Sequence, residues 1–350
     1  MGSGDPKNYN RSLAGMKKTR IAINGFGRIG RSFFRAAFGG ADFDIVAVND
    51  LADTKTLAYL LKYDSVYGRY GREVAAGDGF FSVDGAKIKV LAEKDPARLP
   101  WRDLAVDIMV EATGLFASDK KSQAHLDAGA NRVVITAPAS GDVATALIGV
   151  NDDRFANPPA ITCNASCTTN SVAPVMAILR EQFGIRKAGM VTVHGYTATQ
   201  KLVDGPDAKD LRRGRAAAVN IVPSTTGAAE AVIQAIPELA GKFDAVAVRV
   251  PTIAGSLSVM TVLLEKKTTR EEVNDIFKKA AGEPRWAKIL KATDDPLVSS
   301  DILGEPYGAI VDLSLTKVVD RDLLAVFSWY DNESGYTATL MEHIRRVAAL

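Results

Sequence analysis

The stretch RIAINGFGRIGRSFFRAAFGG, residues 20–40, contains the pattern that decides the fold. It begins with a short apolar run typical of a buried strand, and Gly25, Gly27 and Gly30 follow at close spacing. Apolar residues then recur at helical spacing as far as a Gly-Gly pair. The stretch therefore predicts a strand, a glycine turn and a helix, in that order.

Each of the three glycines has a physical role in this order of elements. Gly25 permits a tight turn, Gly27 lets the backbone approach a pyrophosphate, and Gly30 lets the helix pack closely. The amide groups at the N-terminus of the helix then face an anion. We expect a Rossmann site for a nicotinamide or flavin dinucleotide, with a glycine turn unrelated to nucleotides as the alternative.

The strand pattern DIVAVND, residues 44–50, ends in an acid that fits this site. Asp50 follows Gly25 by 25 residues, 50 − 25, where the usual separation is about 20. A longer first helix or loop could absorb the difference. We expect the Asp50 carboxylate to accept hydrogen bonds from the adenosine ribose.

Two more buried strand patterns, DIMVEATG (107–114) and RVVITAP (132–138), end in small or polar residues. Ligands bind at the carboxyl ends of such strands in open parallel sheets. The residues expected to line the cofactor crevice are therefore Thr113, Gly114 and Thr136. The spacing between the two strands predicts a helix over roughly 118–128, in which we interpret His125 as a surface or structural residue.

The composition places the chain among ordinary soluble enzymes and binding proteins. Its 350 residues suggest about two domains, and its net charge of +2 gives no electrostatic reason to expect nucleic acid or an acidic membrane surface. We see no apolar run that approaches about 18 residues, and two cysteines fit a reducing compartment, so we expect the cytoplasm. Residues 1–15 are interpreted as an expression remnant or a short native arm.

Both cysteines lie in CNASCTTN, residues 163–170. Four interpretations are possible: a disulfide, half of a metal site, one nucleophile beside an unreactive cysteine, or two small buried thiols. A chain of this length needs no disulfide for stability, and none of the three histidines has ligand spacing with another, so we expect no metal.

The sequence after this segment favours a nucleophile. A helical pattern runs from Cys167 to Phe183, with Ser166 as its expected N-cap and Gly184 as its stop. A thiol in the first helical turn feels the positive end of the helix dipole, which favours the thiolate. Cys163 lies on the preceding apolar strand, so Cys167 is the candidate nucleophile.

Further candidates lie in the second half of the chain. His194 ends an apolar strand in VTVHGYTATQ and is a candidate base, although a lone histidine there is more often a structural core residue. The segment KLVDGPDAKDLRRGRAAA predicts a loop that leads into the start of a basic helix near Lys209, as a solvated face or a subunit contact. Arg249 lies in an apolar strand and requires an anion.

The chain also resembles the glyceraldehyde-3-phosphate dehydrogenases of the phosphorylating, glycolytic type. The motifs NGFGRIGR, VND, ASCTTN, HGYTATQ, DLRRGRAAAVNIVPSTTGAA, RVP and WYDNESGY occur in the family's order, from about Arg20 to the C-terminus. The fold that this implies is α/β: an N-terminal Rossmann domain, an α+β catalytic domain with a mixed sheet, and a C-terminal helix, near 336–349, that packs back on the first domain. The expected boundaries are 1–19 for the arm, 20–166 with 331–350 for the Rossmann domain, and 167–330 for the catalytic domain.

The resemblance implies a role for each matching residue. Cys167 is the thiol that attacks the aldehyde, and His194 is its base. The residues implied to bind the substrate phosphate are Thr197, Arg249 and Arg213. Those implied to bind inorganic phosphate are Ser166, Thr168, Thr226 and Gly227. Those implied to bind NAD are Gly25, Phe26, Gly27, Arg28, Ile29, Gly30, Asp50, Thr113, Gly114, Thr136, Asn332 and Tyr336.

The implied reaction is the NAD-dependent oxidative phosphorylation of D-glyceraldehyde 3-phosphate to 1,3-bisphosphoglycerate, through a thiohemiacetal and a thioester on the cysteine. The family assembles as a homotetramer, in which the loop around Gly205 and Pro206 would lie near a neighbour's cofactor. The alternatives are a related phosphorylating aldehyde dehydrogenase, such as erythrose-4-phosphate dehydrogenase, and a nucleotide-binding or RNA-associating protein that has kept the fold without catalysis.

Overall fold

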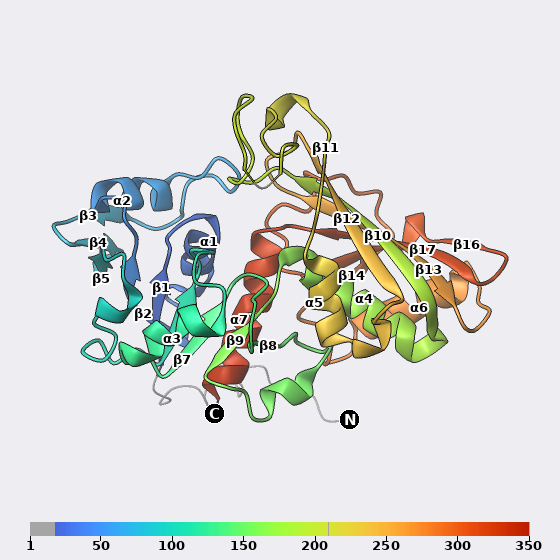
Figure 1. Ribbon diagram of the computed structural model, residues 1–350, viewed down its shortest axis with the longest axis horizontal. Helices are drawn as coiled ribbons and strands as arrows, with labels where there is room; N and C mark the ends of the chain where they lie inside the picture. Colours follow the sequence, from blue (N-terminus) through green and yellow to red (C-terminus); the bar gives the residue numbers. More distant parts are fainter. Residues whose placement is uncertain (1–17, 209, 350) are drawn as a thin grey trace, which may run out of the picture.

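The computed structural model describes residues 18–208 and 210–349, which form two β-sheets side by side with the C-terminal helix between them (Figure 1). Most of the predicted arm at 1–19 and Lys209 lie outside the described residues.

The first sheet contains the glycine turn and has the strand order β3-β4-β5-β2-β1-β6-β7-β9-β8. The strands from β5 to β8 are parallel, and β3 and β4 add an antiparallel edge. The strands are β1 (Thr19–Asn24), β2 (Phe43–Asn49), β3 (Val74–Ala76), β4 (Phe80–Val83), β5 (Ala86–Leu91), β6 (Ile108–Glu111), β7 (Arg132–Ile135), β8 (Ala144–Thr145) and β9 (Ile161–Cys163).

The helices of this half are α1 (Arg28–Ala37), α2 (Thr54–Lys62) and α3 (Asp119–Asp127). Two of them, α1 and α3, were predicted from the sequence, and α2 was not. Helix α1 begins directly after the glycine turn, and Ser118 caps α3 by accepting a hydrogen bond from the Lys121 amide at 3.3 Å. The predicted Rossmann arrangement is confirmed. His125, interpreted as surface or structural, is fully buried, so the surface alternative is wrong.

The second sheet is mixed, as expected, with the order β11-β12-β10-β13-β17-β15-β14, and β16 pairs with β17. Its strands are β10 (Ile185–Gly195), β11 (Val222–Ser224), β12 (Phe243–Val250), β13 (Ser256–Leu264), β14 (Leu290–Thr293), β15 (Ala309–Asp312), β16 (Lys317–Val319) and β17 (Leu323–Tyr330). Its helices are α4 (Cys167–Phe183), α5 (Ala228–Ala235) and α6 (Arg270–Ala281). Short 3₁₀ helices are η1 (Pro96–Arg98), η2 (Asp152–Phe155), η3 (Ala217–Val219), η4 (Pro237–Leu239) and η5 (Leu313–Leu315).

Helix α7 (Ser334–Ala348) returns to the first half of the chain, and the prediction of a C-terminal helix there is confirmed (Figure 1). Thr337 donates a hydrogen bond to the Ser32 hydroxyl of α1 at 3.0 Å, and Arg345 pairs with Asp42 at 2.8 Å. The buried side chains of α7 and α4 belong to one apolar core that joins both sheets.

The predicted start of a basic helix near Lys209 is wrong for the residues described. Residues 211–215 form turns, and only the short η3 follows. Aspartate side chains bind the backbone amides that a helix would use: Asp210 accepts from Arg212 N at 2.9 Å, and Asp204 accepts from Ala216 N at 2.9 Å. Such local side-chain bonds compete with helix formation.

Within residues 18–208 and 210–349, no helix combines the length and the apolar character needed to cross a membrane.

Candidate active site

Cys167 is the first residue of α4, where the sequence placed it. The Ser166 hydroxyl caps the helix by accepting a hydrogen bond from Thr169 N at 3.1 Å. Ala165, one residue earlier, has the left-handed φ of 52° that reverses the chain between β9 and α4. The Tyr336 hydroxyl of α7 donates to the Ala165 carbonyl at 3.0 Å, so the C-terminal helix supports the turn that carries the thiol.

Cys163 has a different environment from Cys167, although neither forms a disulfide. It ends β9, is fully buried, and lies 3.3 Å from the Thr145 hydroxyl. Among the described residues there is no group of three or more His, Cys, Asp or Glu side chains that could hold a metal ion.

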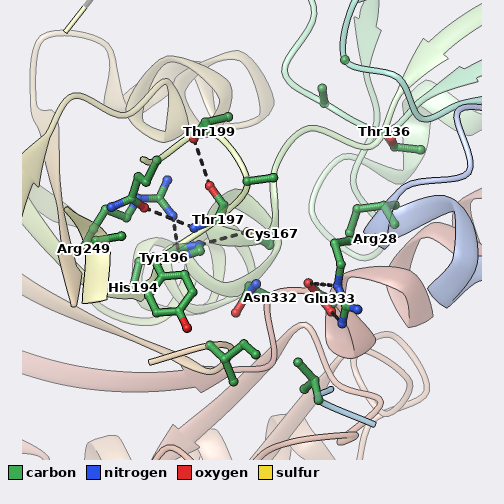
Figure 2. A pocket seen from close by; sticks show the side chains of 18 of the residues that line it. Arg28, Thr136, Cys167, His194, Tyr196, Thr197, Thr199, Arg249, Asn332 and Glu333 are labelled. Atoms are coloured by element: carbon green, nitrogen blue, oxygen red, sulfur yellow. Dashed lines mark hydrogen bonds and ion pairs between the residues drawn. The ribbon is translucent and has the colours of Figure 1, made fainter. Parts of the chain in front are cut away.

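His194 faces the thiol from the second sheet. It lies near the end of β10, and its neighbour across the parallel pair with β12 is Arg249. Its Nε2 is 3.5 Å from Cys167 Sγ, and the edge of its ring contacts the ring of Tyr330. Figure 2 shows Cys167, His194 and Arg249 together on one side of the cavity.

Two contacts of His194 require opposite protonation states of its Nδ1 nitrogen. Nδ1 lies 2.6 Å from the Gly195 carbonyl, which can only accept a proton, and 2.6 Å from Arg249 Nη1, which can only donate one. We assign the proton to Nδ1, because the carbonyl belongs to the adjacent residue and cannot move away, whereas the arginine side chain can. Nε2 then presents its lone pair to the thiol.

Burial and the Arg249 charge determine the protonation of this pair. Burial is the larger cause, and together they lower the pKa of His194 to about 3, so the imidazole is neutral near pH 7. Burial also raises the pKa of the Cys167 thiol, against the opposing effect of the Arg249 charge and the Thr168 amide. Desolvation of the thiol therefore opposes the effect of the helix dipole, which favours the thiolate.

A cavity of about 770 Å³ connects this pair to the carboxyl edge of the first sheet. Figure 2 shows Asn332 between the thiol and the Arg28–Glu333 pair on the opposite side. The Asn332 Oδ1 accepts a hydrogen bond from Gly255 N at 3.0 Å, which orients its amide group. The cavity therefore joins a reactive thiol, a neutral imidazole and the end of a dinucleotide-type sheet.

The glycine turn has the shape that a dinucleotide requires. Gly25 has a φ of +90°, and a Cβ on Gly30 would lie 2.2 Å from the Gly25 carbonyl oxygen, so both positions require glycine. A Cβ on Gly27 would meet nothing within 4 Å, which leaves open space beside the backbone. Gly27 forms the N-cap of α1 without a side-chain cap, so the first amides of α1 can bind a pyrophosphate.

Comparison with known proteins decides which enzymes the chain is related to. Residues 19–119 match the family model of the NAD binding domain of glyceraldehyde 3-phosphate dehydrogenase, and residues 166–332 match that of its C-terminal domain. The chain is 53% identical over 325 residues to a glyceraldehyde-3-phosphate dehydrogenase of Thermotoga maritima, covering 92% of this chain and 97% of that relative. It is 50% identical over 335 residues to one of Mycobacterium bovis, covering 94% and 98%.

The chain belongs to the glyceraldehyde-3-phosphate dehydrogenase family. The match to the NAD binding domain includes the whole glycine turn, and the cofactor of this dehydrogenase is NAD. The match to the C-terminal domain begins at Ser166 and ends at Asn332, and so contains both Cys167 and His194.

The structure of this dehydrogenase brings together many of the residues expected to bind ligands. Those that line the cavity are Arg28, Ile29, Thr113, Gly114, Thr136, Cys167, His194, Thr197, Arg249 and Asn332. Asp50 lies behind the glycine turn, and its carboxylate accepts hydrogen bonds from Phe26 N at 2.8 Å and Ala52 N at 3.0 Å.

Other expected residues lie outside the cavity lining found among the described residues. These are Gly25, Phe26, Gly27, Gly30, Asp50, Ser166, Thr168, Arg213, Thr226, Gly227 and Tyr336. Thr168 is buried, and its hydroxyl contacts that of Tyr330 at 2.9 Å. Arg213 donates to Ser224 Oγ at 2.8 Å and to the Thr225 carbonyl at 3.1 Å, so it braces the Thr-Thr-Gly turn.

Sequence reasoning missed three features of this dehydrogenase. The Arg28 guanidinium bridges Asp64 and Glu333. Tyr330 is buried beside the Cys167–His194 pair, and burial raises its pKa. Glu111 is buried at the carboxyl end of β6. Only Glu111 left a signal in the sequence, as a single acid at the end of the apolar run IMV.

Proposed function

We propose that the chain oxidises and phosphorylates D-glyceraldehyde 3-phosphate to 1,3-bisphosphoglycerate, with NAD as oxidant. The observation that carries the proposal is the 3.5 Å approach of His194 Nε2 to Cys167 Sγ in a cavity that is also lined by Arg28 and Ile29, at the start of α1. Family membership supports the same reaction.

Cys167 and His194 carry out the first step. Nε2 accepts the thiol proton as the sulfur attacks the aldehyde carbon, and a thiohemiacetal forms on Cys167. The backbone amide of Cys167 and the protonated His194 ring are the candidate donors to the developing oxyanion. Loss of the thiol proton to His194 makes the sulfur nucleophilic, because the thiolate is the attacking form.

Arg249 supplies the binding site for the substrate phosphate. It is largely buried, and no carboxylate forms an ion pair with it among the described residues. Its Nη1 instead points to the His194 nitrogen and to the Gly195 carbonyl. A phosphate would replace these contacts by charge-assisted hydrogen bonds, and the Thr197 hydroxyl at the same end of the cavity could add another.

The glycine turn, Asp50 and Asn332 would hold the cofactor. The chemistry supplied by bound NAD is acceptance of a hydride from the carbon attached to Cys167. His194 holds the proton that the thiohemiacetal hydroxyl releases, and a thioester remains on the sulfur. Ser166, Thr168 and the Thr226–Gly227 turn are proposed to position inorganic phosphate, whose oxygen attacks the thioester and releases Cys167 as thiolate.

The test is NADH formation from glyceraldehyde 3-phosphate with and without inorganic phosphate, followed at 340 nm. Full turnover should require phosphate, because the thioester otherwise accumulates after one cycle. Erythrose 4-phosphate and a semialdehyde serve as comparison substrates. A kcat/KM for either that exceeds the value for the triose would reassign the chain to a related phosphorylating aldehyde dehydrogenase, and an unreactive Cys167 would reassign it to a binding protein.

We further propose a homotetramer in the cytoplasm that acts without nucleic acid. Two leucines between β10 and η3 support the assembly, because Leu202 is 83% exposed and Leu211 is 86% exposed. Apolar side chains this exposed favour a subunit contact. The two free cysteines suit a reducing compartment. Light scattering coupled to gel filtration would measure the oligomeric state.

A further inference from the structure

A buried polar cluster lies at the carboxyl edge of the first sheet, beside the cofactor cavity. Its centre is Glu111, which is 1% exposed at the end of β6, and no lysine or arginine forms an ion pair with it among the described residues. A buried carboxylate without a cation is costly unless hydrogen bonds replace the water it has lost. The partners of Glu111 therefore determine what it does.

Four hydrogen-bond donors surround the Glu111 carboxylate. Oε1 accepts from the amide of Thr113 at 2.8 Å and from the Thr113 hydroxyl. Oε2 accepts from Asn24 Nδ2 at 2.7 Å and contacts His125 Nε2 at 3.2 Å. A carboxylate is an acceptor at both oxygens, so it matches four donors without a conflict.

Backbone groups fix the direction of the bond from Asn24. The Glu93 amide donates to Asn49 Oδ1 at 2.9 Å, and the Glu93 carbonyl accepts from Asn49 Nδ2 at 2.9 Å, so Asn49 cannot be turned over. Asn49 Nδ2 also donates to Asn24 Oδ1 at 2.7 Å. Asn24 must therefore present its Nδ2 group to Glu111.

Trp101 fixes the second partner in the same way. Its indole N–H can only donate, and it lies 3.1 Å from His125 Nδ1. Nδ1 is therefore the acceptor, and the proton of the imidazole is on Nε2, which faces Glu111. Asn24 and His125 are donors to Oε2 for reasons outside Glu111, and the Thr113 amide can only donate to Oε1. Either orientation of a carboxamide at this position would therefore place donor against donor.

Glu111 connects this cluster to three turns at the cofactor site. Its side chain holds Thr113, which lines the cavity beside Gly114. Its backbone carbonyl accepts from the amide and the hydroxyl of Thr136, each at 3.0 Å. A Cβ on Gly25 would lie 2.7 Å from Thr113 N, so the glycine turn rests directly on the turn that Glu111 holds.

We infer that Glu111 is a positioning residue for the cofactor: its carboxylate, oriented by Asn24 and His125, sets the Thr113–Gly114 turn against the glycine turn. It acts through these turns and touches neither the thiol nor the His194 ring. The inference rests on the proposed function only for the identity of the cofactor.

The first test is Glu111→Gln, measured as NAD affinity by titration and as KM and kcat. A buried donor without an acceptor would displace the Thr113–Gly114 turn, so we expect the Kd and KM for NAD to rise about tenfold or more, which is 1.4 kcal/mol. The kcat at saturating NAD should stay within about twofold. Unchanged NAD affinity in a folded Glu111→Gln protein would overturn the inference.

The matched control is Asp312→Asn in the second sheet. Asp312 is equally buried, and it also accepts from a tryptophan N–H, Trp329 at 3.1 Å, and from the amide and hydroxyl of Ser314. This variant should lose stability but keep its NAD affinity within about twofold. An equal loss of affinity would mean that any unmatched buried donor has this effect, and the specific role of Glu111 would be refuted.

An exchange of the carboxylate and the carboxamide between positions 24 and 111 tests the direction of the hydrogen bond that joins them. In the double variant Asn24→Asp with Glu111→Gln, the carboxylate introduced at position 24 would accept from the carboxamide introduced at position 111. It would also accept from His125 Nε2, which lies 3.5 Å from the Asn24 Nδ2 atom that the new oxygen replaces. We expect the double variant to recover at least half of the affinity lost in Glu111→Gln, on a logarithmic scale. A double variant no better than the single one would contradict the matching argument.

The wild-type protein provides a test that needs no folded variant. The chain has three histidines, so selective ¹⁵N-histidine labelling gives three imidazoles to assign. His125 should show a protonated Nε2 and an unprotonated Nδ1, and the opposite tautomer would overturn the inference. Wild-type protein that neither binds NAD nor forms NADH would instead contradict the proposed function.

Discussion

The two sheets hold their buried polar groups in different ways. In the first sheet, the cluster around Glu111 is complete, because each donor faces an acceptor, and the Glu93 backbone and the Trp101 indole fix the direction of the bonds. In the second sheet, Arg249 and His194 form a pair whose contacts conflict, and Arg249 has no carboxylate partner among the described residues.

This difference indicates which part of the site has a fixed geometry before any ligand binds. A complete network is rigid and holds one geometry, which suits the binding of a cofactor that every reaction cycle uses. An unpaired arginine beside a neutral histidine is instead completed by an anionic ligand, which suits a substrate. The predictions below test this contrast, beginning with the largest effect.

The two cysteines provide the sharpest comparison, because Cys163 ends a strand of the first sheet and Cys167 faces the second. Iodoacetamide near neutral pH should label Cys167 first, since Cys163 is fully buried and Cys167 lies within reach of His194 Nε2. Activity should be lost completely and in step with labelling, measured by peptide mass spectrometry. Cys163→Ala is the control and should be inactivated at the wild-type rate. Equal or preferential labelling of Cys163 would refute the assignment of the nucleophile.

Arg249→Leu tests whether Arg249, in the second sheet, binds the phosphate of the substrate. Loss of charge-assisted bonds to phosphate should cost about 4 kcal/mol, on the order of a thousandfold in kcat/KM for glyceraldehyde 3-phosphate. The slow oxidation of unphosphorylated glyceraldehyde should be spared. Arg186→Leu is the matched control, because Arg186 lies on the adjacent strand β10 but already has a carboxylate partner, Asp322 at 2.8 Å. If Arg249→Leu lowers kcat/KM for both substrates by the same factor, the role of Arg249 is structural.

The same variant has a consequence for pH. The Arg249 charge contributes to lowering the pKa of His194 to about 3, so its removal should move this pKa upward, toward the ordinary value of 6.5. The acid limb of the kcat profile for unphosphorylated glyceraldehyde should move to higher pH. An acid limb in the same place as in wild type would mean that burial alone lowers the pKa.

His343 lies on α7, which packs on the first sheet, and its substitution tests how the stability of this contact depends on pH. Its Nδ1 donates to the Ala146 carbonyl at 3.0 Å, its Nε2 contacts the Thr162 hydroxyl at 2.8 Å, and burial lowers its pKa to about 4. Between pH 6.5 and 4 the unfolded chain therefore binds a proton that the native state excludes, so stability falls as the pH falls. This contributes roughly 3 kcal/mol to the loss of unfolding free energy between pH 7 and 4.

His343→Gln should remove that part of the pH dependence, because a carboxamide can donate to Ala146 and accept from Thr162 without titrating. Urea unfolding at pH 7 and at pH 4.5 would measure the difference for both proteins. Parallel losses in the variant and the wild type would assign the acid sensitivity to other groups.

Local patterns predicted much of the fold and part of the site. The glycine turn and the first turn of α4 follow from nearby residues, because a strand, an N-cap or a glycine turn is specified within a few positions. The C-terminal helix was implied by the family resemblance. The loop near Arg212 was predicted wrongly because helix propensity competed with aspartate side chains that bind its amides.

The remaining features depend on long-range contacts. Asn24 and Glu111 are 87 residues apart, and Arg28 and Glu333 are 305 apart, so no local pattern could pair them. The pKa of Cys167 is raised by burial, which depends on the tertiary fold, whereas a helix N-terminus can be predicted from the sequence. The chemical type of the site was therefore predictable, but its electrostatic balance was not.

The last prediction concerns the specificity of the first sheet, where we expect NAD to be preferred to NADP. Asp50 is oriented by the amides of Phe26 and Ala52, so its carboxylate is already in place for the ribose hydroxyls of NAD. A 2′-phosphate would meet a like charge there. An unfavourable contact of about 2 kcal/mol gives roughly thirtyfold discrimination in kcat/KM. Pro206, in a loop that the family resemblance places near a neighbour's cofactor, offers no hydroxyl to a 2′-phosphate.

The test is the ratio of kcat/KM for the two cofactors in wild type and in Asp50→Ala, in which the ratio should fall by most of that factor. Asp53→Ala is the matched control, since Asp53 caps α2 by accepting from Thr56 N at 2.9 Å and is exposed to solvent. It should destabilise α2 slightly and leave the ratio unchanged. Lys55 lies nearby in sequence and could attract the 2′-phosphate, so the change in the ratio on substitution of Asp50 decides the comparison. A wild-type ratio near one would show that the Asp50 carboxylate does not select the cofactor. A ratio that Asp50→Ala leaves unchanged would show the same.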